Sequence, residues 1–401
     1  MEKIVQTDIA IIGGGIAGLW LLNRLRQAGF SVILLESDSL GGGQTHQAQG
    51  IIHGGMKYAL QGQTTLAAQA IADMPDVWKE CLQGQGEIDL SNVPVLSRQQ
   101  YLWSTGSLTA KIAGFFAGLA LKSQTQALEK KDFPALFQHP QFHGQVYSLD
   151  ETVIDVYALL RELMMPNQDI IFKIDPMGED QLIFDHADHL ASLEIRAAPM
   201  KTIQVKAQKY IFTAGKGNEL ILKNLKQHTL AAQRRPLHMV IVKHDLDYPL
   251  YAHCLGLGTT PRLTITTHKS HDGKSIWYLG GQLAEEGVKL SPEEQIQAAK
   301  NELKVLFPWL DFSNAQFTSF CVDRAENTQP NGHRPDSCYL QEIENMIVAW
   351  PTKLAFAPLL ATKIIECLTK QSIKPCIADM RELRAWPMPA LAKPIWDKLL
   401  A

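Results

Sequence analysis

The spacing of apolar residues near the start of the chain predicts a strand, a turn, a helix and a second strand. Residues 8–12 form a nearly unbroken apolar run, as expected for a parallel strand that is covered on both faces. After the turn, leucines recur at three-to-four spacing over 19–25, which is the pattern of one buried helix face, and Gly29 is placed to end that helix. A second apolar run over 32–35 ends in Glu36.

The turn between the first strand and the helix is rich in glycine, and each glycine has a mechanical reason. Gly13 makes the tight turn, Gly15 lets the backbone approach a pyrophosphate, and Gly18 lets the helix pack closely on the strand. The free N–H groups at the helix start suit phosphates, and Glu36 can accept hydrogen bonds from ribose hydroxyls. We therefore predict a dinucleotide site whose contacts are Gly13, Gly15, Ile16, Ala17, Gly18, Glu36 and Ser37.

Patterns of two kinds follow further along the chain. The first kind continues the buried strands and helices seen near the N-terminus: a helical pattern over 155–165, an apolar strand over 207–214, a buried strand over 345–350 and a helix over 359–368. Between them, period-two alternation recurs in short runs separated by turn residues. Such runs predict an antiparallel sheet, and they cover 238–242, 262–266 and 276–282.

The chain is long enough for two lobes. It has 401 residues, whereas single hydrophobic cores stop growing at roughly 250–300 residues. No glycine- or serine-rich linker separates the two kinds of pattern, so we expect the lobes to exchange the chain more than once. We predict a Rossmann-like α/β lobe from 1–80, 146–225 and 320–370, an antiparallel-sheet lobe from 81–145 and 226–319, and a C-terminal tail over 371–401.

Composition and charge narrow the function classes. The chain is 46% hydrophobic and 20% charged, and its formal net charge of -3 comes without any run of like charges; an extended nucleic-acid track is therefore not expected. The six cysteines lie far apart without a CxxC pair, so no metal cluster is expected and a reduced, cytoplasmic setting fits best. The apolar run over 112–121 is too short to span a bilayer, which leaves a buried helix and a membrane-surface patch as alternatives.

Two further stretches carry a resemblance to a known superfamily. A second glycine turn, Gly-Gly-Gly-Gln-Thr, occupies 41–45, and Gly-Ile-Ile-His-Gly-Gly-Met-Lys-Tyr occupies 50–58. The second stretch looks like the Ile-His-Gly-Gly-Leu-Arg-Tyr stretch of glycerol-3-phosphate dehydrogenases, and is similar to the Val-Ile-His-Ala-Gly stretch of L-2-hydroxyglutarate enzymes. The chain thus resembles the FAD-dependent D-amino-acid-oxidase superfamily, which also holds sarcosine oxidases.

The resemblance implies FAD as the cofactor, with the loop over 41–51 carrying it toward the active site. Some amine-oxidising relatives link FAD through a histidine of this loop. Here Gln47 stands at the linking place, with His46 beside it, so we expect FAD to be bound without a covalent bond. An Ala-Gly pair after the strand over 207–214 and a Lys-Leu pair near the end resemble further contacts. The implied set is Gly43, Gln44, Thr45, Gly50, Ile51, Ala214, Gly215, Lys353 and Leu354.

Around Lys353 the chain departs from the glycerol-3-phosphate dehydrogenases. Those enzymes carry Gly-Gly-Lys-Leu-Thr-Thr, whereas this chain has Pro-Thr before Lys353-Leu354 and Ala-Phe after it. The departure weakens the specific assignment to glycerol phosphate as substrate. It does not alter the implied role of Lys353 and of the helix after it, which is to stabilise the negative charge of the reduced flavin.

Oxidation of a carbon beside a hydroxyl or amine group also needs a substrate anchor and, for an alcohol, a base. His53 is the candidate base, because its ordinary pKa lies near neutrality; the alternative is a core histidine satisfied by backbone. Arg324 is the first candidate to anchor a carboxylate or phosphate, with surface pairing to Asp323 or Glu326 as the alternative. The further candidate substrate contacts are Lys57, Tyr58 and Arg262.

These residues predict an FAD-dependent dehydrogenase or oxidase that transfers a hydride to flavin N5 from a small anionic metabolite, either a 2-hydroxy acid or an amino acid. Oxygen or a quinone is the expected electron acceptor. The segment around His53, with Lys57 and Tyr58, favours a hydroxylated substrate. Secondary-amine oxidation of the glycine or sarcosine type, flavin-dependent modification of a tRNA base, and flavin binding without turnover are the alternatives. No metal, nucleic-acid partner or transmembrane segment is expected, while peripheral membrane contact is left open.

Overall fold

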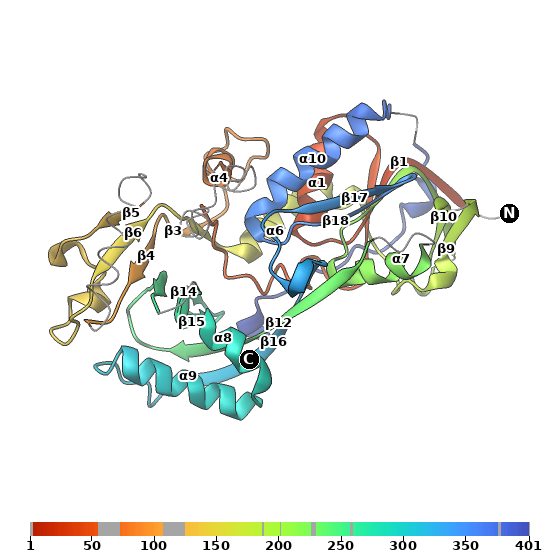
Figure 1. Cartoon of the computed structure of the whole chain (residues 1–401). Coiled ribbons are helices and arrows are strands. Elements are labelled where there is room, and N and C mark those ends of the chain that lie inside the picture. The colour runs from red at the N-terminus through yellow and green to blue at the C-terminus, as the bar shows by residue number, and fades with distance from the viewer. Residues whose placement is uncertain are drawn as a thin grey trace.

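The computed structural model describes residues 3–54, 73–106, 125–186, 188–200, 202–225, 230–256, 260–375 and 378–400. Within these ranges the chain forms two eight-stranded sheets and a small two-stranded one. The two large sheets belong to separate lobes, and the chain passes between the lobes more than once (Figure 1). The predicted fold class, a Rossmann-like α/β lobe beside a lobe built on a second sheet, is confirmed.

The first sheet has the order β17-β18-β11-β1-β2-β8. Five of its strands run parallel to one another, and they are β1 (Ile4–Ile12), β2 (Val32–Glu36), β8 (Ile171–Lys173), β11 (Ile203–Phe212) and β18 (Met346–Trp350). Antiparallel strands complete the sheet, namely β17 (Tyr339–Ile343), β9 (Leu182–His186) and β10 (His189–Ile195). The apolar runs predicted over 8–12, 32–35, 207–214 and 345–350 all fall in its parallel strands.

Helices bury both faces of this sheet. On one face lie α1 (Ile16–Gln27), α6 (Val156–Met164) and α10 (Ala357–Lys370), with α4 (Met74–Leu82) packed against them (Figure 1). The other face is covered by α7 (Asn218–Asn224) and by residues 380–386. Because both faces are covered, the central parts of these strands are continuous apolar runs, as in 9–12 of β1 and 32–35 of β2, whereas the first part of β11 alternates.

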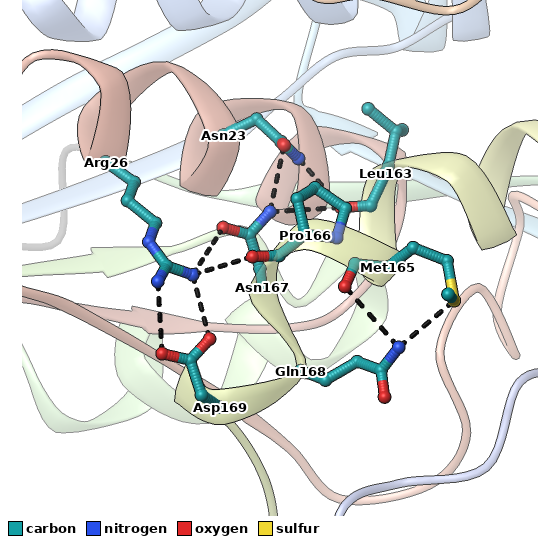
Figure 2. A network of polar contacts seen from close by, with 8 residues as sticks. All are labelled: Asn23, Arg26, Leu163, Met165, Pro166, Asn167, Gln168 and Asp169. Carbon is teal, nitrogen blue, oxygen red and sulfur yellow. Dashed lines mark hydrogen bonds and ion pairs between the residues drawn. The ribbon is translucent and has the colours of Figure 1, made fainter.

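A buried polar network fixes the C-terminal half of α1 against the end of α6 and the 3-10 helix η4 (Met165–Ile170) (Figure 2). Asn23 donates to the carbonyl oxygens of Leu19 and Leu163, each at 2.8 Å, and accepts from Asn167 at 2.9 Å. At the exposed edge, Arg26 forms two contacts with Asp169 at 2.8 and 3.1 Å. The network holds α1, which carries the predicted dinucleotide turn, in one position on the sheet.

The start of α6 offers a test of local stability. The Asp155 carboxylate caps the helix by accepting the N–H of Ala158 at 2.9 Å. We expect Asp155→Ala to lower the free energy of unfolding by about 1 kcal/mol, because a first-turn N–H then loses its acceptor. Asp155→Asn keeps the acceptor and should cost about half as much or less. Urea unfolding followed by tryptophan fluorescence measures both, and equal losses would contradict the capping role.

The second sheet has the order β16-β12-β15-β14-β13-β4-β6-β5. The runs predicted over 238–242, 262–266 and 276–282 pair antiparallel, and so do the other neighbours except β13 and β4, which run parallel. The strands are β4 (Gln100–Trp103), β5 (Thr125–Ala127), β6 (Val146–Leu149), β12 (Ala232–His244), β13 (Ala252–Cys254), β14 (Leu263–Lys269), β15 (Ser275–Gly280) and β16 (Gln316–Asn327). Two short strands pair separately, β3 (Val95–Ser97) with β7 (Val153–Ile154).

The alternation in these strands separates an apolar face from a polar one. Helix α9 (Pro292–Leu306), which is capped by Ser291, packs on the apolar face, and the short helix α8 (Gln282–Glu286) lies near it (Figure 1). The opposite face carries buried polar side chains at alternate positions, namely His253, Thr264, Thr266, His268 and Tyr278. A buried polar face of this kind is suited to lining a ligand site.

The polar face is joined to the first lobe by the loop over 43–51. The Tyr278 hydroxyl donates to the Gln47 carbonyl oxygen at 2.7 Å, and the Gln49 amide donates to the Tyr278 carbonyl oxygen at 2.8 Å. The loop that the sequence assigns to the cofactor therefore lies directly against the second sheet. The lobe boundaries given above stay a prediction.

The C-terminal segment also contacts both lobes. On the first lobe, the Leu40 N–H donates to the Ala390 carbonyl oxygen at 2.8 Å, and the Ala392 N–H donates to the Leu40 carbonyl oxygen at 3.0 Å. Beyond them, α11 (Ile395–Leu399) reaches the second lobe, where the Trp396 indole donates to the Lys269 carbonyl oxygen at 3.2 Å. The apolar run over 112–121 lies outside the described residues. Among those that are described, no helix has the length and apolar character needed to cross a membrane.

Candidate active site

The glycine turn between β1 and α1 is packed as the sequence predicts. Gly13 has φ +110°, and a Cβ built on it would lie 2.6 Å from the Ala214 Cα at the end of β11. A Cβ on Gly18 would run into the Gly13 carbonyl oxygen. Both positions therefore require glycine, the first for its backbone angle and the second for the close contact between the helix and the turn.

The start of α1 leaves room for an anionic group. Gly15, the residue before the helix, supplies no side-chain cap, and the first turn holds no acidic residue. The N–H of Ile16 donates to the Thr45 hydroxyl at 3.0 Å, so the second glycine loop is held beside the helix start. A side-chain carbon built on Gly43 would meet no atom within 4 Å, and one on Gly215 only the Gln44 amide oxygen at 3.6 Å. An elongated ligand with a negatively charged middle fits along this strip.

Glu36 already has two backbone partners. Its carboxylate accepts the N–H of Gly14 and that of Asp38, each at 2.7 Å. These contacts fix the carboxylate at the tip of β2, beside the glycine turn. Two bonds leave further lone pairs on the oxygens, so the predicted contact with ribose hydroxyls stays open to Glu36.

At the far end of the same loop, His53 is paired with a buried acid. Its Nδ1 lies 3.2 Å from Oε2 of Glu151, and the other carboxylate oxygen accepts the N–H of Gly54 at 3.0 Å. The Ile52 N–H donates to the Thr152 carbonyl oxygen at 2.8 Å, so the two chain segments are fixed side by side. The Glu151 side chain is only 7% exposed, whereas that of His53 is 34% exposed, so His53 is the member of the pair that a ligand can reach.

The electrostatics of the pair favour a neutral imidazole beside an ionised carboxylate. Burial lowers the pKa of His53, the positive charges of Lys353 and Arg334 add to that, and Glu151 opposes it only in part. Burial acts to raise the pKa of Glu151, but His53, His253 and the Gly54 N–H outweigh it and leave this pKa below its ordinary value. At neutral pH, His53 can therefore accept a proton.

A second histidine faces the same carboxylate from the polar face of the second sheet. The rings of His53 and His253 are stacked with centroids 6.2 Å apart, and His253 Nδ1 lies 2.8 Å from the Thr264 hydroxyl. One ligand atom each of His53, Glu151 and His253 lies within 4.8 Å of the others. The two lobes thus meet at a cluster of two imidazoles and one carboxylate.

Two arginines face each other on the paired strands β16 and β12, and the charge of Arg334 acts both on Arg324 and on His53. Arg324 donates through Nε to the Arg235 carbonyl oxygen at 3.0 Å. Burial, followed by the charges of Arg235 and Arg334, lowers the pKa of Arg324 to about 10, which still leaves the guanidinium protonated at neutral pH. A buried cation surrounded by other cations is an electrostatic site for an anion.

The acids next to Arg324 in sequence are engaged elsewhere. Asp323 accepts from Arg234 at 2.9 Å, and Glu326 holds Arg235 in two contacts at 2.7 and 3.0 Å. Within the ranges that the structure describes, Arg324 makes no ion pair of its own. Surface pairing with Asp323 or Glu326, the alternative reading of Arg324, is therefore not what the structure shows.

Lys353 lies at the start of the segment that leads into α10. It precedes the 3-10 turn η9 (Leu354–Phe356), and its ammonium group lies 5.2 Å from the centre of the Phe356 ring. The helix expected directly after Lys353 therefore begins with a 3-10 turn. The Trp78 indole donates to the Ala355 carbonyl oxygen at 3.0 Å and fixes this turn from α4. Lys353 thus stands near the His53 pair as a positive charge in a fixed backbone setting.

Comparison with known proteins identifies the family. A family model described as DAO, FAD-dependent oxidoreductase, matches residues 8–168. The probable FAD-dependent oxidoreductase of Pseudomonas aeruginosa is 44% identical over 405 residues, which is 100% of both chains. The chain belongs to the FAD-dependent oxidoreductase family. A crystal structure of the Pseudomonas protein covers 100% of both chains with a TM-score of 0.85 and 41% identity.

Two more distant structures share the oxidoreductase fold. One is the dithionite-reduced L-alpha-glycerophosphate oxidase of Mycoplasma pneumoniae with FAD bound, at 16% identity and a TM-score of 0.64 over 91% of this chain and 95% of that one. The other is glycine oxidase of Geobacillus kaustophilus, at 14% identity and a TM-score of 0.61 over 94% and 97%. The predicted superfamily, FAD as cofactor and the enzyme class of oxidoreductase are confirmed.

The strip beside α1 fits FAD, and Gly18 tests that fit in the oxidoreductase. We expect Gly18→Ala to weaken FAD binding about tenfold, because overpacking of a tight contact typically costs about 1–3 kcal/mol. The added methyl group pushes the Gly13 turn away from the helix start. Equilibrium dialysis against FAD measures the affinity. Gly256→Ala is the control for a glycine variant, because its backbone angle is ordinary and a Cβ there would meet its nearest atom, the Arg262 Cβ, at 3.4 Å. Unchanged affinity in Gly18→Ala would contradict the assigned site.

The structure places some of the remaining predicted contacts of the oxidoreductase away from the site and others beside it. Arg262 is held by Glu302 of α9 in two contacts, at 2.5 and 2.8 Å, on the side of the second sheet that faces away from the first lobe, so we give it no part in the proposed anchor. Lys57 and Tyr58 lie outside the described residues. Gly50, at φ +75°, and Ile51, bridged to Val153, lie on the path from the glycine strip to His53.

Three residues of this site are absent from the sequence-based prediction: Glu151, His253 and Arg334. Glu151 follows β6 and precedes a two-residue apolar strand, so the only local signal is an acid next to a buried segment. His253 is the polar middle of an Ala-His-Cys strand that is buried throughout. Neither signal predicts that Glu151 or His253 lies close to His53, because the three residues are far apart in the sequence.

Proposed function

We propose that the oxidoreductase oxidises a small anionic metabolite, a 2-hydroxy acid or an amino acid, at the carbon that carries the hydroxyl or amino group. The observation that supports this proposal most directly is that the His53–Glu151 pair and the positively charged Arg324 share an electrostatic neighbour, Arg334. A proton acceptor and an anion anchor are the two groups that such a reaction asks of the protein.

Each residue has a defined part in the proposed reaction. FAD, when bound along the glycine strip, supplies the hydride acceptor. Arg324 holds the carboxylate or phosphate of the substrate with parallel N–H contacts. His53 takes the proton of a hydroxyl group as the carbon is oxidised. Lys353 contributes positive charge, which favours the build-up of negative charge at the flavin end of the site.

We further propose that FAD is held without a covalent bond. The His46 ring faces the Gly41 and Gly43 carbonyl oxygens, at 3.0 and 2.9 Å, and Gln47 occupies the linking place that the family resemblance indicates. The electron acceptor, oxygen or a quinone, stays a prediction.

Anaerobic reduction of the flavin tests the proposed function. The purified oxidoreductase is loaded with FAD and mixed without oxygen with 2-hydroxy acids, amino acids, sarcosine and glycerol phosphate, while the visible spectrum is followed. Bleaching by an anionic hydroxy or amino acid supports the proposal, and bleaching by sarcosine alone would favour secondary-amine oxidation. A flavin that photochemical reduction bleaches but none of these compounds does would overturn it. Acid precipitation of the same preparation should release all of the flavin.

A further inference from the structure

We propose that Glu151 is a positioning residue that orients His53 as a base, and that the pair selects a hydroxyl rather than an amino group as the reacting group of the substrate. The inference rests on the proposed function and narrows it to 2-hydroxy acids or other anionic alcohols. It is carried by the contacts of Glu151, which bind both the histidine and the backbone that presents it.

The contacts of Glu151 define which nitrogen of His53 carries the hydrogen. An ionised carboxylate only accepts hydrogen bonds, and Glu151 uses one oxygen for His53 Nδ1 at 3.2 Å and the other for the Gly54 N–H at 3.0 Å. Nδ1 of a neutral His53 therefore bears the hydrogen, and Nε2 keeps its lone pair. This assignment follows from the hydrogen-bond partners.

The surroundings of the pair keep that arrangement rigid. Ile51 and Val153 form a β-bridge, and Ile52 bonds to Thr152, so the backbones on both sides of His53 and Glu151 cannot shift independently. His253, which is 6% exposed, stands on the far side of the carboxylate. The charged groups that act on His53 are Glu151, Lys353 and Arg334. A side chain held by its partner and by a paired backbone meets the demand for a preorganised catalytic group.

The chemistry of the two substrate classes differs at this point. Oxidation of an alcohol removes a hydride from carbon and a proton from oxygen, so a carbonyl forms while the hydride passes to FAD and the proton to His53 Nε2. The hydroxyl proton has to leave because a hydroxyl is not ionised at neutral pH. A neutral amine can give up the hydride with its nitrogen lone pair already free, and it needs no base. An amino acid that binds as its ammonium form loses that proton before the hydride leaves, whereas a hydroxyl loses its proton during the oxidation itself. An oriented, neutral histidine therefore speeds the redox step itself only for a hydroxyl substrate.

A metal ion is the main rival explanation for two histidines and a glutamate. Zinc is bound at about 2.0–2.2 Å by nitrogen and oxygen ligands, which brings tetrahedral ligands to within about 3.5 Å of one another. The three ligand atoms lie within 4.8 Å of one another, and a zinc titration distinguishes a metal site from a proton-accepting pair. His53 Nδ1 contacts Glu151 at 3.2 Å, as a proton-accepting pair requires, whereas His253 Nδ1 bonds to the Thr264 hydroxyl at 2.8 Å.

The experiment compares Glu151→Gln and Glu151→Asp with the wild type and with Glu302→Gln, which removes a carboxylate from the Arg262 ion pair on the far face of the second sheet. Two measurements are made on FAD-loaded protein. The first is the nitrogen NMR spectrum of labelled histidine across pH, with His53 assigned from His53→Asn. The second is the anaerobic rate of flavin reduction by an active hydroxy acid and, where one is found, by an amino acid.

We expect Glu151→Gln to lower the pKa of His53, because a negative charge that favours the protonated ring is lost. We also expect the neutral ring to populate both of its tautomers, with the hydrogen on Nδ1 or on Nε2, because an amide can accept or donate a hydrogen bond. The rate with a hydroxy acid should fall about 10- to 100-fold, and its rise with pH should move to lower pH. Glu151→Asp should restore much of the rate, and Glu302→Gln should match the wild type. The rate with an amino acid should change less than threefold.

Clear results would overturn the inference. An unchanged His53 spectrum in Glu151→Gln would show that Glu151 does not set the hydrogen position, whatever the rates. Equal losses with a hydroxy acid and an amino acid would remove the claim about the substrate class. Tight zinc binding to the wild type that is lost in His253→Ala would establish the metal site instead. The NMR result is independent of turnover, so if no compound reduces the flavin, the proposed function fails while the positioning of His53 is still decided.

Discussion

Replacing His53 with asparagine should lower the rate of anaerobic flavin reduction by a hydroxy-acid substrate about 10²- to 10⁴-fold, which is the usual contribution of a general base. Asparagine can still donate to Glu151 but has no basic nitrogen. In the wild type, the rate should rise as pH increases through the lowered pKa of His53, because only the neutral ring accepts a proton. In the variant that rise should vanish.

Stopped-flow absorbance under anaerobic conditions measures the effect of the His53 variant. The matched control is His189→Asn on β10, where the imidazole bonds to Asp185 at 2.9 Å far from the glycine strip; it should reduce at the wild-type rate. FAD content should be the same in all three proteins, since the dinucleotide contacts lie elsewhere. A His53 variant within threefold of the wild type across pH would rule out the proposed base.

The second large effect concerns the anion anchor. Arg324→Met should lower kcat/KM for an anionic substrate about 10²- to 10³-fold, because the loss of one partner of a buried charged contact costs roughly 2–5 kcal/mol. Most of the change should appear in KM if the contact is equally strong in the substrate and transition-state complexes. In the variant, the negative charge of the substrate would enter a site in which Arg235 is already paired with Glu326.

Steady-state kinetics with the substrate and with a neutral analogue of it check the anchor. The wild type should prefer the anion strongly, and Arg324→Met should lose most of that preference. Arg234→Met is the control, because Arg234 is paired with Glu219 and Asp323 at the exposed edge and lies one strand away. If Arg324→Met keeps the preference for the anion, the anchor lies on another residue.

Much of the first lobe follows from short-range rules. Gly13 is needed for its backbone angle and Gly18 for its close contact with the Gly13 carbonyl oxygen. Both requirements are local, so the strand, turn and helix can be predicted from about forty residues of sequence. Helix α9 is similar, since its Ser291 cap and Glu294 form a local capping box. Such elements depend on neighbours in the chain, which the sequence displays directly.

The site itself is less accessible to sequence reasoning. The sequence alone identifies two candidate site residues: His53, which lies in the stretch over 50–58 that resembles known enzymes, and Arg324, a candidate anion anchor. Their partners depend on tertiary contacts: Glu151 meets His53 only because β7 lies beside Ile51, and His253 faces both only because β13 places it on the polar face. The parallel pairing of β13 with β4 is equally long-range. Alternation predicts that a strand has two faces, but not which strand becomes its neighbour.

The C-terminal segment has a consequence for the way the enzyme moves. It is hydrogen-bonded to the backbone of Leu40 in one lobe and, through Trp396, to Lys269 in the other, and so it tethers the two lobes to each other. A hinge motion that separated the lobes would have to break the hydrogen bonds at one of these two ends or change the conformation of the segment between them. The cost of large-scale opening therefore includes the undocking of a tail that is far along the chain from His53 and Arg324.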